Sequence, residues 1–412
     1  MDGFLTVGQP VAVAAVRGML GTHVPHAVLL SGPPSTGKLP LALDLAAALL
    51  CTGATGGDRP CRACRGCRMV EHGNHPDVFR LEPQGAGGQI LIGKAESPDP
   101  GTVRWLIPLL ALAPMEGIAR VAIVRDAQRM GDDAQSALLK TLEEPLPRTT
   151  IILCADDEER LLPTVRSRCA RIRLGPVGVR DVERLLAERG LADAPTAARL
   201  ARLASGRPGL AVAYAAMPEA AAIRAELART LLDLMAEGRA ARLRAAGDLM
   251  KRAATLAALL SPPAEPSAEP VRRGRGKAAA RQAQSASIPG AETAAGPLSG
   301  GAGARGDESA EPAEPSTKAS AADRRRALGT LLDAWRDLAR DLVLAQLGTD
   351  SVVRDVTLLE ELEAAARDLA PDAPATALAG LARAGELLDA NVSPELLLDV
   401  LLLRWPRRRH GA

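Results

Sequence analysis

Short apolar runs alternate with longer amphipathic stretches in the N-terminal part of the chain. Residues 27–30, 121–124 and 150–154 are apolar runs of strand length, and 170–174 is a fourth strand-like segment. Residues 38–50 and 133–144 have the apolar periodicity of helices, and Pro145 is expected to end the second. Strands that are buried on both faces and alternate with helices indicate a parallel sheet covered on both sides. We therefore expect an α/β domain over residues 1–174.

After Gly175 the pattern becomes helical. Residues 179–189, 194–203 and 208–216 predict a small bundle of three short helices. Longer helices are expected within 219–260 and again from 324 to 405. Residues 261–323 are rich in Pro, Gly, Ser, Ala and Glu and have few large apolar side chains, so we expect a disordered linker there.

Composition narrows the functional classes. Aromatic residues make up only 1% of the chain, so its cores must consist of Leu, Val, Ile and Ala. The 51 basic and 49 acidic residues leave a net charge of +2, which argues against a strongly basic nucleic-acid-binding surface. The N-terminus lacks the pattern of a signal peptide, and the most apolar stretch, 396–403, is too short to span a membrane. We expect a cytoplasmic protein.

Residues 32–39 have the pattern of a phosphate-binding loop, except at the last position. Gly32, Gly37 and Lys38 fit G-x-x-x-x-G-K, in which backbone N–H groups and the lysine bind phosphate oxygens. The Ser or Thr that normally follows and binds Mg²⁺ is replaced by Leu39. Because phosphoryl transfer depends on that ion, the loop predicts weak or absent ATP binding and little hydrolysis.

A second motif of nucleotide-hydrolysing sites is also incomplete. Asp126 follows the predicted strand 121–124, where an acidic residue is expected beside the phosphate loop. An active ATPase usually has a Glu next to this Asp, which orients the attacking water, but here the neighbour is Ala127. The alternative interpretation is that Asp126 is only a turn residue at the end of a strand.

Four cysteines predict a structural zinc site after the first of these helices. They are Cys51, Cys61, Cys64 and Cys67, with the spacing C-x9-C-x2-C-x2-C. The two-residue gaps let thiolates converge on one tetrahedral Zn²⁺, and four thiolates leave no open coordination position for catalysis. The alternative is four unligated surface thiols. His72 and His75 lie nearby and could replace a ligand, although we interpret them as ordinary loop residues.

Arg168 lies in Ser167-Arg168-Cys169, just before the last predicted strand. An arginine at the edge of a nucleotide-binding fold can reach the γ-phosphate in a neighbouring subunit and stabilise the charge of the transition state. Its position, more than the tripeptide itself, suggests that Arg168 is such an arginine finger.

Several segments together resemble the bacterial DNA polymerase III clamp-loader subunits of the AAA+ superfamily. They are Val7-Gly8-Gln9, Pro25-His26-Ala27, the four-cysteine insertion, residues 120–130, the L-L-K-T-L-E-E-P stretch at 138–145 and Ser167-Arg168-Cys169. The resemblance covers residues 4–216 well and 324–405 more loosely. It implies an AAA+ domain over 1–174, a helical lid over 175–216 and a helical collar over 217–412 that the linker interrupts.

Within this family, gamma/tau motor subunits carry a complete phosphate loop and an Asp-Glu pair, whereas the delta-prime branch is commonly degraded at both places. Leu39, Ala127 and Ala155-Asp156, which replaces a Thr-rich sensor segment, favour the delta-prime branch. So does the S-G-R-P-G-L-A segment at 205–211. The resemblance then implies a rigid stator subunit that contains a structural zinc ion. It also implies that Arg168 of this subunit acts on the ATP bound by a neighbouring subunit. The implied partners are gamma/tau and delta subunits, and through them the sliding clamp and primed DNA of a nucleoid-associated replisome.

Two other functions stay open. A gamma/tau-type motor would hydrolyse ATP itself with the same phosphate loop. A zinc-dependent DNA-binding module would use the cysteines together with the basic run 272–277, which lies among acidic residues in the predicted linker.

Overall fold

The computed structural model describes residues 3–84, 88–144, 146–261, 320–349, 353–390 and 392–409. The predicted disordered linker 261–323, apart from its two ends, lies outside these residues, as do Pro145 and the basic run 272–277. The described residues form one compact unit.

The N-terminal part is built on a five-stranded, fully parallel sheet in the order β2-β3-β4-β1-β5. The strands are β1 (Ala27–Ser31), β2 (Val78–Leu81), β3 (Arg120–Val124), β4 (Thr149–Ala155) and β5 (Ala170–Arg173). Every residue of β1, β3 and β4 is buried, as their apolar sequences predict. The sequence did not predict β2, which contains Arg80 and is mostly half-buried at the edge of the sheet.

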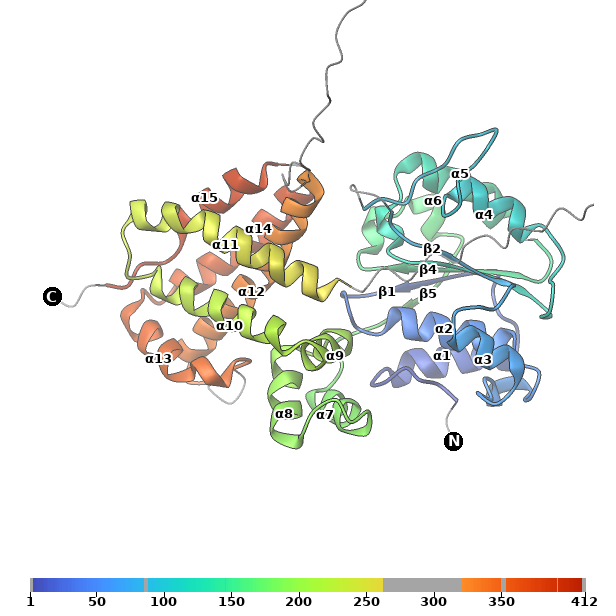
Figure 1. Cartoon of the computed structure of the whole chain (residues 1–412), viewed down its shortest axis with the longest axis horizontal. Coiled ribbons are helices and arrows are strands. Elements are labelled where there is room, and N and C mark those ends of the chain that lie inside the picture. Colours follow the sequence, from blue (N-terminus) through green and yellow to red (C-terminus); the bar gives the residue numbers. More distant parts are fainter. Residues whose placement is uncertain are drawn as a thin grey trace, which may run out of the picture. The chain divides into compact units, whose positions relative to one another are not determined.

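Helices cover both faces of this sheet (Figure 1). One layer consists of α1 (Pro10–Gly21), α2 (Lys38–Leu49) and α3 (Arg65–Glu71), and the other of α4 (Val103–Leu110), α5 (Asp132–Glu143) and α6 (Pro163–Arg166). Alternate residues of each strand enter opposite cores: Leu30 packs with the α1–α3 layer and Leu29 with the α4–α6 layer. The α/β prediction is therefore confirmed.

The rest of the described chain is helical. Its helices are α7 (Val179–Glu188), α8 (Ala194–Leu203), α9 (Pro208–Ala216), α10 (Pro218–Asp233), α11 (Arg239–Leu260), α12 (Ala321–Gln346), α13 (Leu359–Asp368), α14 (Ala373–Asp389) and α15 (Pro394–Arg404). The first three match the predicted short helices closely. Within the described parts of the chain, no helix is both long and apolar enough to cross a membrane.

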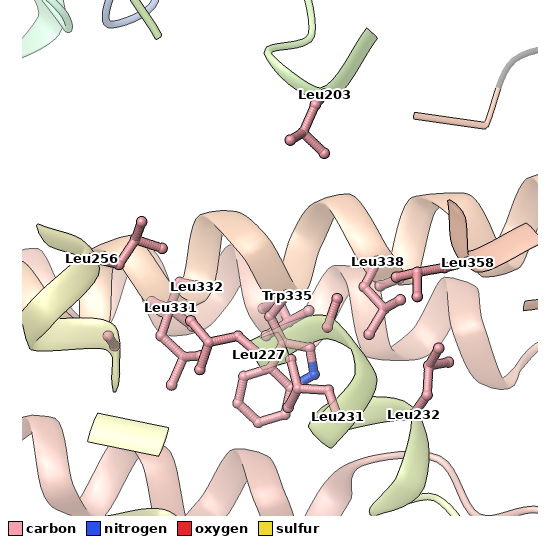
Figure 2. Close-up of a cluster of buried hydrophobic side chains, with 14 of the residues drawn as sticks. Leu203, Leu227, Leu231, Leu232, Leu256, Leu331, Leu332, Trp335, Leu338 and Leu358 are labelled. Carbon is pink, nitrogen blue, oxygen red and sulfur yellow. The ribbon is translucent and has the colours of Figure 1, made fainter. Parts of the chain in front are cut away.

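One apolar cluster connects α7 through α15. Figure 2 shows Trp335 of α12 among leucines of α10 and α12, including Leu227, Leu231 and Leu331. Trp335 is fully buried and packs edge-to-face on Trp405, with ring centroids 5.1 Å apart. Two of the few aromatic residues of the chain thus pack on each other in the helical core, which otherwise consists mostly of leucine and alanine side chains.

Candidate functional site

The phosphate loop joins β1 to α2 and has the backbone that its glycines predict. Gly32 has φ +145° and Gly37 has φ +107°, values that other residues rarely adopt. A Cβ on Gly32 would lie 2.1 Å from the carbonyl oxygen of Leu174 in the segment after β5. The loop therefore keeps the glycine-dependent form of a phosphate-binding turn, and Lys38 begins α2 directly after it.

The Lys38 ammonium is engaged entirely within the protein. Its Nζ donates to the carbonyl oxygens of Gly32 and Pro33 at 2.7 and 2.6 Å, and it forms an ion pair with Asp156 at 2.7 Å. A lysine ammonium has three N–H donors, so these three partners can use all of them. The Lys38 side chain is only 8% exposed.

The ends of β3 and β4 bring two carboxylates to the same place. Asp126 follows β3, and Asp156 follows β4, the strand that lies between β3 and β1. Burial raises the pKa of Asp126, the negative charge of Asp156 raises it further, and Arg125, Arg129 and Lys38 act against both. The predicted proximity of Asp126 to the phosphate loop is thus supported by its electrostatic interaction with Lys38.

The two residues at which the nucleotide motifs are incomplete, Leu39 and Ala127, pack in the apolar cores. Ala127 is fully buried in the α4–α6 core, and Leu39 packs on the α1–α3 core. Neither side chain offers an oxygen to a metal ion or to water. The sequence had singled out Asp156 only as a departure from a family pattern. Its ion pair with Lys38 was missed, although its place directly after a buried strand neighbouring β1 was a usable signal.

The four predicted cysteine ligands come together into one cluster. The sulfur atoms of Cys51, Cys61, Cys64 and Cys67 all lie within 4.8 Å of one another, so they could hold a metal ion. Backbone N–H groups point at three of them: Cys61 donates to Cys51 Sγ at 3.4 Å, Cys64 to Cys61 Sγ at 3.3 Å and Cys67 to Cys64 Sγ at 3.5 Å. Such bonds suit thiolates, the form in which cysteine binds metals.

The protonation of Cys64 follows from these contacts. Burial by itself would raise the pKa of the Cys64 thiol, but hydrogen bonds from the N–H groups of Cys67 and Thr52, together with those of the Cys67 and Cys61 side chains, lower the pKa to about 5. All six cysteines of the chain are free, so the cluster is not a pair of disulfides.

The two nearby histidines lie outside the cluster. His72 Nδ1 is 2.6 Å from the carbonyl oxygen of Arg68 at the end of α3. His75 is buried, and its Nδ1 accepts the N–H of Asp77 at 3.1 Å. This agrees with their interpretation as ordinary loop residues.

Arg62 connects the cysteine loop to the helix that follows the phosphate loop. It lies between Cys61 and Cys64 and forms an ion pair with the buried carboxylate of Asp44 on α2. Asp44 also accepts N–H groups of Leu5 and Thr6. The cysteine loop, α2 and the N-terminal segment therefore share one charged contact.

Arg168 is a surface residue held by the element beside it. Its Nη1 donates to the carbonyl oxygen of Thr164 in α6 at 2.8 Å and to Ser167 Oγ at 3.3 Å. Its Nη2 forms an ion pair at 2.7 Å with Glu143, the last residue of α5. The Arg168 side chain is 34% exposed. The partners of Arg168 lie in α5, in α6 or directly after α6. None of them belongs to the group formed by Lys38, Asp126 and Asp156 at the phosphate loop.

Comparison with known proteins finds similarity to subunits of DNA polymerase III. Residues 9–178 match the family model described as "DNA polymerase III, delta subunit". DNA polymerase III subunit delta' of Bacillus subtilis is 33% identical over 175 residues, which are 42% of this chain and 49% of that protein. The delta' subunit of Escherichia coli is 34% identical over 188 residues, covering 46% of this chain and 54% of that protein.

A tau subunit matches as well. DNA polymerase III subunit tau of Escherichia coli is 31% identical over 207 residues, 48% of this chain and 30% of that protein. The chain spans about half the length of the delta' relatives it matches. The matched family region contains the whole sheet and the phosphate loop, which agrees with the predicted resemblance to subunits of DNA polymerase III.

Proposed function

We propose that this chain, whose α/β domain belongs with the delta' and gamma/tau subunits of DNA polymerase III, is a delta-prime-type stator of a clamp loader. The proposal rests on one contrast. The Lys38 ammonium has its three hydrogen-bond partners inside the protein, whereas the Arg168 side chain stays accessible at the surface. A subunit of this kind serves a neighbour's ATP without turning over its own.

Arg168 would complete the ATP site of an adjacent gamma/tau subunit. A guanidinium placed on the γ-phosphate stabilises the negative charge that spreads over its oxygens in the transition state. Such a group must be exposed in the free subunit and held in a defined direction. The Arg168 side chain is 34% exposed, and its contacts with Thr164 and Glu143 hold its direction.

Cys51, Cys61, Cys64 and Cys67 would hold a structural zinc ion. The donor set suits Zn²⁺, which favours four tetrahedral thiolates, and the N–H···S bonds stabilise the charge of those thiolates. The ion would fix the loop that carries Arg62, and so would brace α2. ATP binding by this chain would be weak or absent.

The helical C-terminal part would form the collar that joins this chain to gamma/tau and delta subunits. The sliding clamp and primed DNA would be reached through that complex, in the cytoplasm at the replisome. Residues 1–174, 175–216 and 217–412 would then be the AAA+, lid and collar domains. The near-neutral net charge of +2 suits a subunit that binds other proteins first.

The decisive experiment is the ATPase of the reconstituted complex with Arg168→Ala. We expect a loss of about tenfold or more, the low end for an arginine finger, with a folded and assembled subunit. Arg171→Ala, an exposed arginine of β5, is the matched control and should keep the rate. An unchanged rate with Arg168→Ala would remove that residue from the role.

The match to a tau subunit favours one other function, a motor that hydrolyses ATP itself. The two functions differ in the behaviour of the unmodified chain alone. A motor turns over ATP in the presence of Mg²⁺ and primed DNA, whereas a stator does not. Steady turnover that disappears with Lys38→Ala would establish the motor and end the stator proposal.

A further inference from the structure

We propose that Asp156 is the specificity-determining residue that keeps nucleotide out of this site, because its carboxylate takes the hydrogen bond of Lys38 that an outer phosphate would take. The inference rests on the proposed stator function and adds a residue to it. It assigns the exclusion of nucleotide mainly to Asp156, to which the missing metal ligand at Leu39 adds, and leaves to Ala127 the loss of hydrolysis.

The argument begins with the donors of Lys38. Two are used by carbonyl oxygens of the phosphate loop itself, at Gly32 and Pro33. These two acceptors carry no net charge and belong to the loop that would surround a phosphate. The third donor is used by a carboxylate, whose full negative charge attracts the ammonium more strongly than a carbonyl oxygen does. Asp156 is therefore the competitor that a phosphate must displace.

The sheet holds Asp156 in this place. Ala155 is paired with Ser31 in the register of β4 against β1, and the N–H of Gly32 donates to the carbonyl oxygen of Ala155 at 3.2 Å. The N–H of Asp156 donates to Gln128 Oε1 at 3.1 Å. The residue after β4 is thus fixed beside the first residue of the phosphate loop, and the carboxylate needs no rearrangement to meet Lys38.

Charge acts in the same direction. Asp126 lies close enough to Asp156 for the two negative charges to affect each other. A nucleotide would add its phosphate charges to this pair of carboxylates. Active sites of this class offset such charges with Mg²⁺, but Leu39 offers that ion no ligand. The carboxylate on Lys38 therefore both occupies the donor and repels the ligand.

The test is nucleotide binding by the isolated chain, measured by calorimetric titration with ADP in the presence and absence of Mg²⁺. Asp156→Asn removes the charge with little change of shape, and Asp156→Ala removes the acceptor altogether. We expect both to bind ADP about tenfold or more tightly than the unmodified chain, as loss of one charged competitor predicts. Asp157→Asn is the control: it is the next residue, its side-chain partners are Glu159 and Arg160, and binding should stay as in the unmodified chain.

A second variant ties the gain to Lys38. In Asp156→Asn, a further Lys38→Ala substitution should abolish the new binding, because the freed ammonium is its cause. The proposal is overturned if the Asp156 variants, folded as judged by circular dichroism, bind ADP no better than the unmodified chain. It is also overturned if their gain survives Lys38→Ala. Either result leaves the arginine-finger experiment untouched, so failure here is distinguishable from failure of the stator function.

Discussion

At the scale of single residues, the ion pair between Glu143 and Arg168 sets the direction of the proposed arginine finger. The pair is exposed, so it contributes at most about 1 kcal/mol. We predict that Glu143→Gln lowers the ATPase of the reconstituted complex by about two- to fivefold, since Arg168 loses one of its orienting contacts. The rate is to be compared with that of Glu144→Gln, a neighbour that is also exposed and should have no effect.

A combined variant separates orientation from general damage. If Glu143 acts through Arg168, then Glu143→Gln should cause no further loss in a complex that already carries Arg168→Ala. An additional loss of the same size would show that Glu143 acts elsewhere.

The single residues of the site were predictable where a local motif defines them. Gly32, Gly37, Lys38 and the four cysteines follow fixed spacings in the sequence, and the structure places them as those spacings require. The partners of Lys38 and Arg168 were not predictable in this way. Asp156 reaches Lys38 through the register of β4 against β1, for which its place after a buried strand was the one sequence signal, and Glu143 reaches Arg168 from the end of α5, which no local pattern records.

At the scale of elements, the cysteine loop should depend on a metal ion. We predict one zinc per chain by elemental analysis, and its loss in Cys61→Ser/Cys64→Ser. Loss should also free Arg62 from Asp44 and loosen α2. We expect a destabilisation of about 2 kcal/mol, roughly a 5 °C lower melting temperature for a domain of this size.

Cys154→Ser is a suitable control for the zinc prediction. Cys154 is buried in β4 and belongs to the α1–α3 core, so its substitution should keep the zinc content while changing stability. A native protein that contains no metal and melts at the same temperature with and without a chelator would contradict the zinc site.

The loop at residues 115–117 depends on the buried carboxylate of Asp77. Asp77, before β2, accepts the N–H groups of Met115, Glu116 and Gly117 at 2.6 to 2.9 Å. Burial alone would raise the pKa of Asp77, but the three N–H groups outweigh it and lower the pKa below its ordinary value of 3.8. The ionised form therefore stabilises the fold above pH 3.8, and this contribution is lost as the pH falls through the lower folded-state value.

The expected consequence is a pH-dependent difference between two proteins. Asp77→Asn should lower the free energy of unfolding by about 1–3 kcal/mol at pH 7, measured by urea denaturation. The difference should shrink as the pH is lowered toward 3, because the unmodified Asp77 then becomes protonated as well. If the difference in the free energy of unfolding between the two proteins stays constant over this pH range, the charge of Asp77 does not stabilise the loop at residues 115–117.

Elements were predictable where burial and periodicity agree. The apolar runs of β1, β3 and β4 gave correct strands because both faces are covered. Strand β2 has only one neighbour and keeps Arg80 partly exposed, so its sequence lacks an apolar run. Helix α12 was expected from residue 324, but Ser320 and Asp323 form a capping box that starts it at Ala321.

At the scale of the whole molecule, a buried charge cluster joins segments that are far apart in the sequence. Asp337 of α12 accepts Arg224 of α10 at 2.7 Å, lies 3.5 Å from Arg207 before α9 and pairs with Arg354. Burial first, and then the charges of Arg207 and Arg224, lower the pKa of Arg354 to about 10. Helical periodicity predicted the helices but not this cluster, since charged residues in a helix normally indicate an exposed face.

Asp337 is the residue on which these three arginines depend. Asp337→Asn would remove the carboxylate that all three buried or half-buried guanidinium groups contact, and removing one partner of a buried ion pair costs about 3–5 kcal/mol. We predict a loss of that size in urea denaturation, with the transition of the helical part most affected. Asp333→Asn, one turn earlier on α12 and half-exposed, removes the same charge and should cost less than about 1 kcal/mol. Equal losses for the two variants would show that the cluster is no more than an ordinary set of surface charges, whereas the predicted difference would make Asp337 the electrostatic centre of the helical part.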